Sequence, residues 1–113
     1  MIHVFLHFLV PWMIATGFYR EHWLRVTAVL WATMLVDLDH LLADPIYDPE
    51  RCSIGFHPLH TAPAIGLYAA LFALPWFADR AIKPGRERKA LRTLHLVGLG
   101  LLVHMGLDGI DCL

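Results

Sequence analysis

The sequence predicts an all-α, polytopic membrane protein: a four-helix bundle of four transmembrane helices in a single domain, residues 1–113. The first reason is composition, because 58% of the residues are hydrophobic and 17% are charged, whereas soluble domains average about 45–50% apolar and about 25% charged residues. The second is that stretches such as GLYAALFALPWF, residues 66–77, lack the polar stripe of a helix in a soluble bundle. The third is the position of the basic residues, which cluster between alternate apolar segments.

The apolar segments have about the length that crosses a bilayer, roughly 20 residues at about 1.5 Å rise per residue. In chain order they are Ile2 to Tyr19, Trp23 to Leu42, Phe56 to Ala78 and Leu91 to Leu107. The first is similar to a signal peptide, but it has no basic start and Pro11 interrupts it, so we expect it to stay as a helix. No repeat or long linker divides the chain, so one domain is predicted.

Small residues and prolines predict local features of these segments. Gly98, Gly100 and Gly106 are expected to let the fourth segment approach its neighbours closely. Pro63 and Pro75 are expected to kink the third segment.

The basic residues predict the orientation of the bundle. Eight of nine lie in YREHWLR, residues 19–25, and DRAIKPGRERKALR, residues 79–92. These connections follow the first and third segments, so they share one end of a four-helix bundle, and the positive-inside rule places that end in the cytoplasm. We expect a multi-pass protein of the bacterial inner (plasma) membrane, with both termini and the loop from Ala43 to Gly55 on the outer side.

The opposite end gathers histidines and carboxylates from all four segments. In chain order these residues are His3, His7, Asp37, Asp39, His40, His57, His60, His104, Asp108 and Asp111. Within each segment most are spaced three or four apart and share a helix face. Asp39 points away from Asp37, so it either orients a ligand from outside the site or reaches the site only if the helix end unwinds. Because an ionised carboxylate near the bilayer centre costs about 2.5–3.5 kcal/mol, a bound cation would remove most of this cost.

Two interpretations of this layer are open. Buried histidines and carboxylates can form proton relays or interhelical hydrogen bonds without a metal. The chain, however, contains no Asn and no Gln, so its polar interior consists almost entirely of metal-ligand types, and we favour metal binding. Imidazole and carboxylate without thiolate suit Zn²⁺, Fe, Mn²⁺ or Ni²⁺. Zinc is the first choice, and the number of ligands leaves room for two or three ions.

Three motifs carry a resemblance: DLDH at residues 37–40, HPLHT at 57–61 and HMGLD at 104–108. They resemble the DxDH, H…TH and HxxxD signatures of the LexA-regulated, membrane-bound metal-dependent hydrolases, a family grouped with zinc phospholipase C and P1-type nucleases. The whole chain is also similar to a small bacterial membrane protein family of unknown function. The hydrolase pattern spaces its paired histidines more widely than His57 and His60. The resemblance implies phosphoester hydrolysis and these ligands: Asp37, His40, His57, His60, His104 and Asp108.

Three functions follow from the metal layer. The first is a metal-dependent hydrolase acting on a phosphoester or lipid-like substrate near the outer face, with Asp39 or Asp111 as catalytic general base. The second is a metal transport or sensing protein, which needs a polar path that the inner halves of the segments lack. The third is a structural membrane module held together by a closed metal site.

The expected partners follow from charge and size. Membrane lipids are expected partners, with residues 80–92 contacting anionic headgroups, and the net charge of −1 argues against nucleic acid. A homodimer would cover the exposed surface of so small a bundle. His22 and His95 lie at the basic end, too far from the metal layer to join it.

Cys52 and Cys112 are both expected on the outer side. An oxidising periplasm would let them form a disulfide that fixes the end of the fourth segment beside the loop. The alternative is that Cys112 is a metal ligand, since it follows Asp111 directly. If the orientation were reversed, both cysteines would stay reduced.

Overall fold

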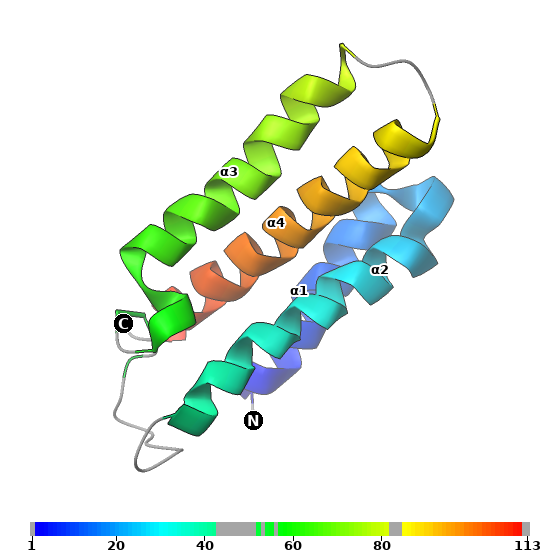
Figure 1. The fold of residues 1–113 in the computed structure, drawn as a ribbon. Helices are drawn as coiled ribbons and strands as arrows, with labels where there is room; N and C mark the ends of the chain where they lie inside the picture. The colour runs from blue at the N-terminus through cyan, green and yellow to red at the C-terminus, as the bar shows by residue number, and fades with distance from the viewer. Residues whose placement is uncertain (1, 43–51, 53, 56, 82–84, 112–113) are drawn as a thin grey trace.

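The computed structural model is a bundle of four helical rods that run alternately up and down, with overall extents of 48 × 27 × 22 Å (Figure 1). It describes residues 2–42, 52, 54–55, 57–81 and 85–111, without the side chains of residues 2, 3, 39–42, 86, 87 and 111. The elements, with η for a 3-10 helix, are α1 (Ile2–Phe18), η1 (Arg20–His22), α2 (Trp23–Ala32), η2 (Thr33–Leu42), η3 (Pro58–His60), α3 (Ala62–Asp79) and α4 (Arg86–Asp111). The first rod is α1, the second is α2 with η2, the third is η3 with α3, and the fourth is α4 (Figure 1). Every regular element in these ranges is helical, which confirms the all-α class.

The ends of the rods are arranged as the sequence predicts. The start of α1 and the end of α4 lie at one end of the bundle, together with the end of η2 and with η3 (Figure 1). The end of α3 and the start of α4 lie at the other end, where α1 also passes into α2. The segments that carry the histidines and carboxylates therefore meet at one end, and the basic connections meet at the other.

The second rod changes from α-helix to 3-10 helix at Thr33. In a 3-10 helix, residues three apart lie on one face. Thr33 and Val36 are both buried, and Asp37 follows on the neighbouring face. The prediction of one regular α-helix to Leu42 is therefore wrong in its second half, and the tighter winding sets the direction in which Asp37 points.

The third rod also differs from the predicted continuous helix. The turn η3 is separated from α3 by Thr61, whose backbone is extended at φ −86° and ψ 163°. Pro63 lies in the first turn of α3, where a missing N–H costs nothing, so the predicted kink at Pro63 is wrong. The Tyr68 hydroxyl donates to the Leu59 carbonyl at 2.7 Å, and this bond ties η3 to α3.

The fourth rod packs closely against its neighbours because of two glycines. A Cβ at position 98 would lie 2.7 Å from the carbonyl carbon of Leu71 in α3. A Cβ at position 100 would lie 2.6 Å from Thr33 Oγ1. Close approach is thus confirmed for Gly98 and Gly100, but it is wrong for Gly106, where nothing would lie within 4 Å of a Cβ.

The buried apolar residues form two clusters along the bundle axis. One cluster, in the half near the basic connections, consists of Ala15, Val26, Leu30 and Leu96. The other, in the half that carries the predicted metal layer, consists of Val36, Tyr68 and Met105. Each cluster joins residues from three rods, so both halves of the bundle have a core of their own.

Among the described residues, two helices are long and apolar enough to cross a membrane: α3 over Ala62–Asp79 and α4 over Arg88–Ile110. In α1 the apolar stretch Val4–Phe18 is shorter than a span, and α2 has 10 residues before it gives way to η2. By length and composition, then, two of the four predicted spans are supported. Side chains on α3 such as Leu67 and Leu74 are 59% and 67% exposed, as expected for a helix that faces lipid.

Candidate metal centre

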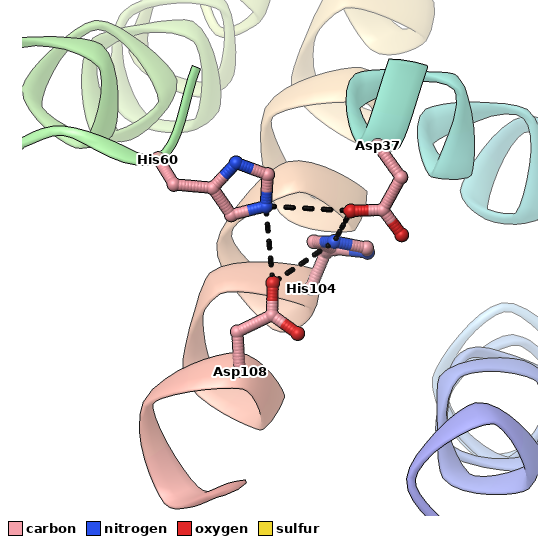
Figure 2. A group of neighbouring side chains, drawn as sticks. All are labelled: Asp37, His60, His104 and Asp108. Carbon is pink, nitrogen blue, oxygen red and sulfur yellow. Dashed lines mark hydrogen bonds and ion pairs between the residues drawn. The ribbon is translucent and has the colours of Figure 1, made fainter. Parts of the chain in front are cut away.

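Four of the predicted ligands, contributed by three separate elements, converge on one another (Figure 2). Their elements meet at the end of the bundle opposite the basic connections (Figure 1). His104 and Asp108 are four residues apart on α4, so they share one face of that helix. The other two arrive from different rods. The four residues are Asp37 from η2, His60 from η3, and His104 and Asp108 from α4.

The backbone of η3 holds His60 in position. Pro58 occupies the first position of this turn, where its fixed φ suits a helix start. The His60 N–H donates to the His57 carbonyl at 2.9 Å, and the His60 carbonyl accepts from the Gly55 N–H at 2.9 Å. Both backbone groups of His60 are therefore bonded, which fixes the direction of its side chain toward α4.

Imidazole nitrogens and carboxylate oxygens alternate around a ring of four atoms. His104 Nε2 lies 2.9 Å from Asp37 Oδ1 and 3.2 Å from Asp108 Oδ2. His60 Nε2 lies 3.4 Å from Asp37 Oδ1 and 3.1 Å from Asp108 Oδ2. One ligand atom from each residue lies within 4.8 Å of the other three.

These separations suit a metal ion. Nitrogen and oxygen ligands about 2.0–2.1 Å from a tetrahedral zinc are about 3.3 Å from one another, and the four N–O distances here are 2.9 to 3.4 Å. One imidazole nitrogen carries at most one hydrogen, yet each Nε2 faces two carboxylate oxygens. A cation at the centre would interact with all four atoms, so this group can hold a metal ion.

Most of the cluster is buried inside the bundle. The side chains of His60, His104 and Asp108 are 0%, 2% and 4% exposed. Two carboxylates in such a site require compensating positive charge, because burying an unpaired charge is costly. The Asp37 side chain is 39% exposed, so the cluster is open to solvent on the Asp37 side.

His7 lies next to the group of four and contacts one of its members. Its Nε2 donates to Asp108 Oδ1 at 3.0 Å, while Asp108 Oδ2 faces the two imidazoles of the cluster. The His7 ring also meets the His104 ring edge to face, with centroids 4.5 Å apart. His7 thus lies outside the group of four and contacts one of its members, and its predicted role as a ligand stays a prediction.

His57 is buried beside His60, at 2% exposure. The two rings are T-shaped with centroids 5.6 Å apart, and His57 lies outside the group of four. The side chains of His3, Asp39, His40 and Asp111 lie outside the described part of the chain. Their predicted roles as ligands or general base therefore stay predictions.

The predicted disulfide is only partly within the described residues. Cys52 is half-buried and is not a free thiol. Cys112 lies outside the described residues. The pairing of Cys52 with Cys112 therefore stays a prediction, as does the alternative of Cys112 as a ligand.

The two remaining histidines lie at the basic end, as predicted. His22 belongs to η1, and His95 lies nine residues before His104 on α4, about 13 Å away along the helix axis. Both line a cavity between the basic connections. The sequence did not predict this cavity, and its signal for it is limited to the basic residues on both sides.

Comparison with known protein families identifies a match over the first 80 residues. The model described as "Family of unknown function (DUF6122)" matches residues 1–80 of this chain. The matched part contains Asp37 and His60 and ends before α4, which carries His104 and Asp108. No curated protein and no solved structure matches the chain.

Proposed function

The chain belongs to this family of unknown function, DUF6122, and we propose that it is a membrane protein that binds a divalent transition metal and uses it for hydrolysis. One observation carries the proposal: four nitrogen and oxygen atoms from three helical elements alternate around a buried centre at separations of 2.9 to 3.4 Å. Zinc is the proposed metal, because it readily takes four nitrogen and oxygen ligands in tetrahedral geometry. Iron, manganese and nickel accept the same ligand types.

The number of ions is the second part of the proposal. The group of four accounts for one ion. His7, His57 and the predicted ligands His3 and His40 would complete a site with two or three ions. A count of metal per chain separates these arrangements.

The proposed reaction is hydrolysis of a phosphoester or a lipid-like substrate near the outer face. A divalent metal held by these four residues would have to accept a further ligand on the Asp37 side, and it would then polarise a phosphoryl oxygen and activate water for attack. His60, His104 and Asp108 would hold the metal from the buried side of the site. The substrate would approach the metal from the side of Asp37, which is partly exposed. Asp39 or Asp111 would act as the general base.

A structural role is the second candidate, and the number of protein ligands favours it. Four protein ligands complete a tetrahedral shell, and three of them are nearly fully buried. The gap beside the cluster, lined by His7, Thr33, Gly100 and other residues, is too narrow for a water molecule. In that case the metal would stabilise the bundle without reacting. Transport fits less well, because the apolar cluster around Leu30 and Leu96 lies between the site and the basic end.

We further propose that all four rods lie in the bacterial inner membrane with the basic end in the cytoplasm. The arrangement of the rods supports this, because both basic connections are at the same end (Figure 1). The metal centre would then be near the periplasmic face. In that oxidising compartment Cys52 and Cys112 would form their disulfide.

The first test is elemental analysis of the full chain, purified in detergent without chelator, beside the His60→Ala variant. We expect at least one equivalent of one transition metal per wild-type chain and a loss of most of it in His60→Ala. His22→Ala is the matched control, since His22 is an exposed histidine at the other end of the bundle. Asp37→Asn, which keeps the side-chain volume, serves as a second variant if His60→Ala does not fold.

Three outcomes separate the proposals. A folded wild-type protein without transition metal would contradict metal binding. Bound metal together with metal-dependent cleavage of phosphodiester or phospholipid substrates supports the hydrolase, provided that Asp37→Asn abolishes the cleavage. Bound metal without cleavage of any such substrate leaves the structural role.

A further inference from the structure

A second candidate site lies at the basic end of the bundle, where a cavity of about 730 Å³ opens between the two basic connections. It is formed by the α1–α2 connection, the start of α2, the end of α3 and the start of α4. This basic-end cavity is on the opposite side of the apolar cluster from the candidate metal centre. The inference that follows is therefore independent of metal binding.

The lining of the basic-end cavity has an excess of positive charge. Four permanent cations line it, and two carboxylates, Glu21 and Asp79, oppose them. Asp79 Oδ1 accepts from Arg88 Nε at 2.8 Å, and Arg88 does not line the cavity. Arg92 Nε lies farther from the same oxygen, at 3.7 Å. The four lining cations are Arg20, Arg25, Lys89 and Arg92.

One of these cations is held in place. Arg25 Nη2 donates to Thr93 Oγ1 at 3.0 Å, which fixes the guanidinium between α2 and α4. A guanidinium held in one orientation loses less conformational entropy when it binds an anion. Because Arg20 and Arg25 come from one connection and Lys89 and Arg92 from the other, the cations approach from two sides.

The inner wall of the cavity is polar as well. His95 Nδ1 is 2.7 Å from the Phe72 carbonyl, and since a carbonyl only accepts, this nitrogen carries the hydrogen. His95 Nε2 is 3.3 Å from the Tyr19 hydroxyl, so both nitrogens of the ring have a hydrogen-bond partner. Both side chains line the cavity, and they present a fixed polar surface beside the cations.

The rest of the lining is apolar. Phe18 is 83% exposed and Trp76 45% exposed at the surface of the bundle, and both line the cavity with Val26, Pro75 and Leu96. Trp and Tyr are enriched at the headgroup level of membranes, because their rings are apolar with one polar group. The cavity thus combines cations with an aromatic and apolar wall.

From this combination we propose that the basic-end cavity binds the phosphate group of an anionic amphiphile. Guanidinium groups match phosphate oxygens in geometry and bind them with charge-assisted hydrogen bonds. Phe18, Trp76 and Leu96 would contact the attached apolar chain. An anionic phospholipid has this chemistry, and a soluble phosphate monoester shares only its polar part.

The test is a lipid titration of the protein in detergent, followed by native mass spectrometry. The probes are short-chain phosphatidylglycerol, short-chain phosphatidylcholine and glycerol 3-phosphate. We expect phosphatidylglycerol to bind about tenfold more tightly than phosphatidylcholine, and Arg25→Gln and Arg92→Gln each to weaken its binding about five- to tenfold. Arg80→Gln is the matched control, because Arg80 lies outside the cavity and stacks on Trp76. It should change the affinity less than about twofold.

The outcomes are distinct. Equal weakening by Arg80→Gln and Arg92→Gln would overturn the proposal, because it would show a diffuse attraction to the charged end. Equal binding of phosphatidylglycerol and phosphatidylcholine would overturn it too. Binding of glycerol 3-phosphate as tight as that of phosphatidylglycerol would keep a phosphate site but exclude the amphiphile. Since loss of the Arg25–Thr93 bond can destabilise the protein, Lys89→Gln provides a second variant at an exposed position.

Discussion

Asp108 connects the group of four candidate ligands to a neighbouring histidine, because its two carboxylate oxygens have different partners. Oδ2 faces His60 and His104 at 3.1 and 3.2 Å, and Oδ1 accepts from His7 at 3.0 Å. A hydrogen bond to the outer oxygen of a ligating carboxylate orients it and tunes its interaction with the metal. His7 thereby connects α1, which contributes none of the four ligands, to the site.

This arrangement predicts unequal effects of two histidine substitutions. His7→Ala should weaken metal affinity by about 10- to 100-fold, the range found when a partner of a ligand is removed. His104→Ala removes a ligand and should abolish stoichiometric binding. Competition with a chromogenic chelator measures both, with His22→Ala as the control. If His7→Ala abolishes binding as His104→Ala does, His7 is itself a ligand.

At the scale of elements, α4 organises the bundle. It carries His104 and Asp108 at one end and the cavity residues Arg92 and His95 at the other. Between them Gly98 brings its backbone against α3, and Gly100 against Thr33 at the start of η2. The position of Asp37 relative to His104 therefore depends on how closely η2 packs against α4.

Two glycines of α4 provide a matched test of this packing. Gly98→Ala places a methyl group 2.7 Å from a backbone atom of α3, and overpacking of this kind costs about 1–3 kcal/mol. Gly106→Ala meets nothing within 4 Å and should be neutral or stabilising by about 0.5–1 kcal/mol, the difference in helix propensity. Thermal unfolding in detergent measures both variants. Equal stabilities of the two would show that α3 and α4 are not in close contact.

At the scale of the whole molecule, the candidate metal centre joins three rods at one end of a narrow bundle. A metal that binds only the folded state adds stability by mass action, about 2.7 kcal/mol when its free concentration is 100 times its Kd. The contribution of the metal is large compared with the typical free energy of unfolding of about 5–15 kcal/mol. It matters more in this bundle because the buried apolar clusters are small.

Removal of the metal should therefore lower the melting temperature of the wild-type protein. For a domain of about this size the loss corresponds to a decrease on the order of 10 °C. The measurement is a thermal scan with and without chelator, followed by the addition of Zn²⁺ in excess. Asp37→Asn should melt at the same temperature with and without chelator. A wild-type protein that contains metal but is insensitive to its complete removal would exclude the structural role.

The sequence determined the helical class, the arrangement of the rods and the end of the bundle at which the ligands gather. Asp37, His60, His104 and Asp108 were all among the predicted ligands, because spacing along a helix and alternation of rod direction are local properties. Local spacing also placed His22 and His95 away from the metal layer. Of the four predicted membrane spans, length and composition in the structure support two.

Only the tertiary structure decided which of the predicted ligands share one centre. It separated His7, bonded to Asp108 Oδ1, from the four atoms that face one another. The sequence could not decide this, because the 3-10 winding after Thr33 and the separate turn at His60 both change the direction of a side chain, and helical spacing predicts neither. The basic-end cavity likewise exists only where two connections, about sixty residues apart in the chain, come together.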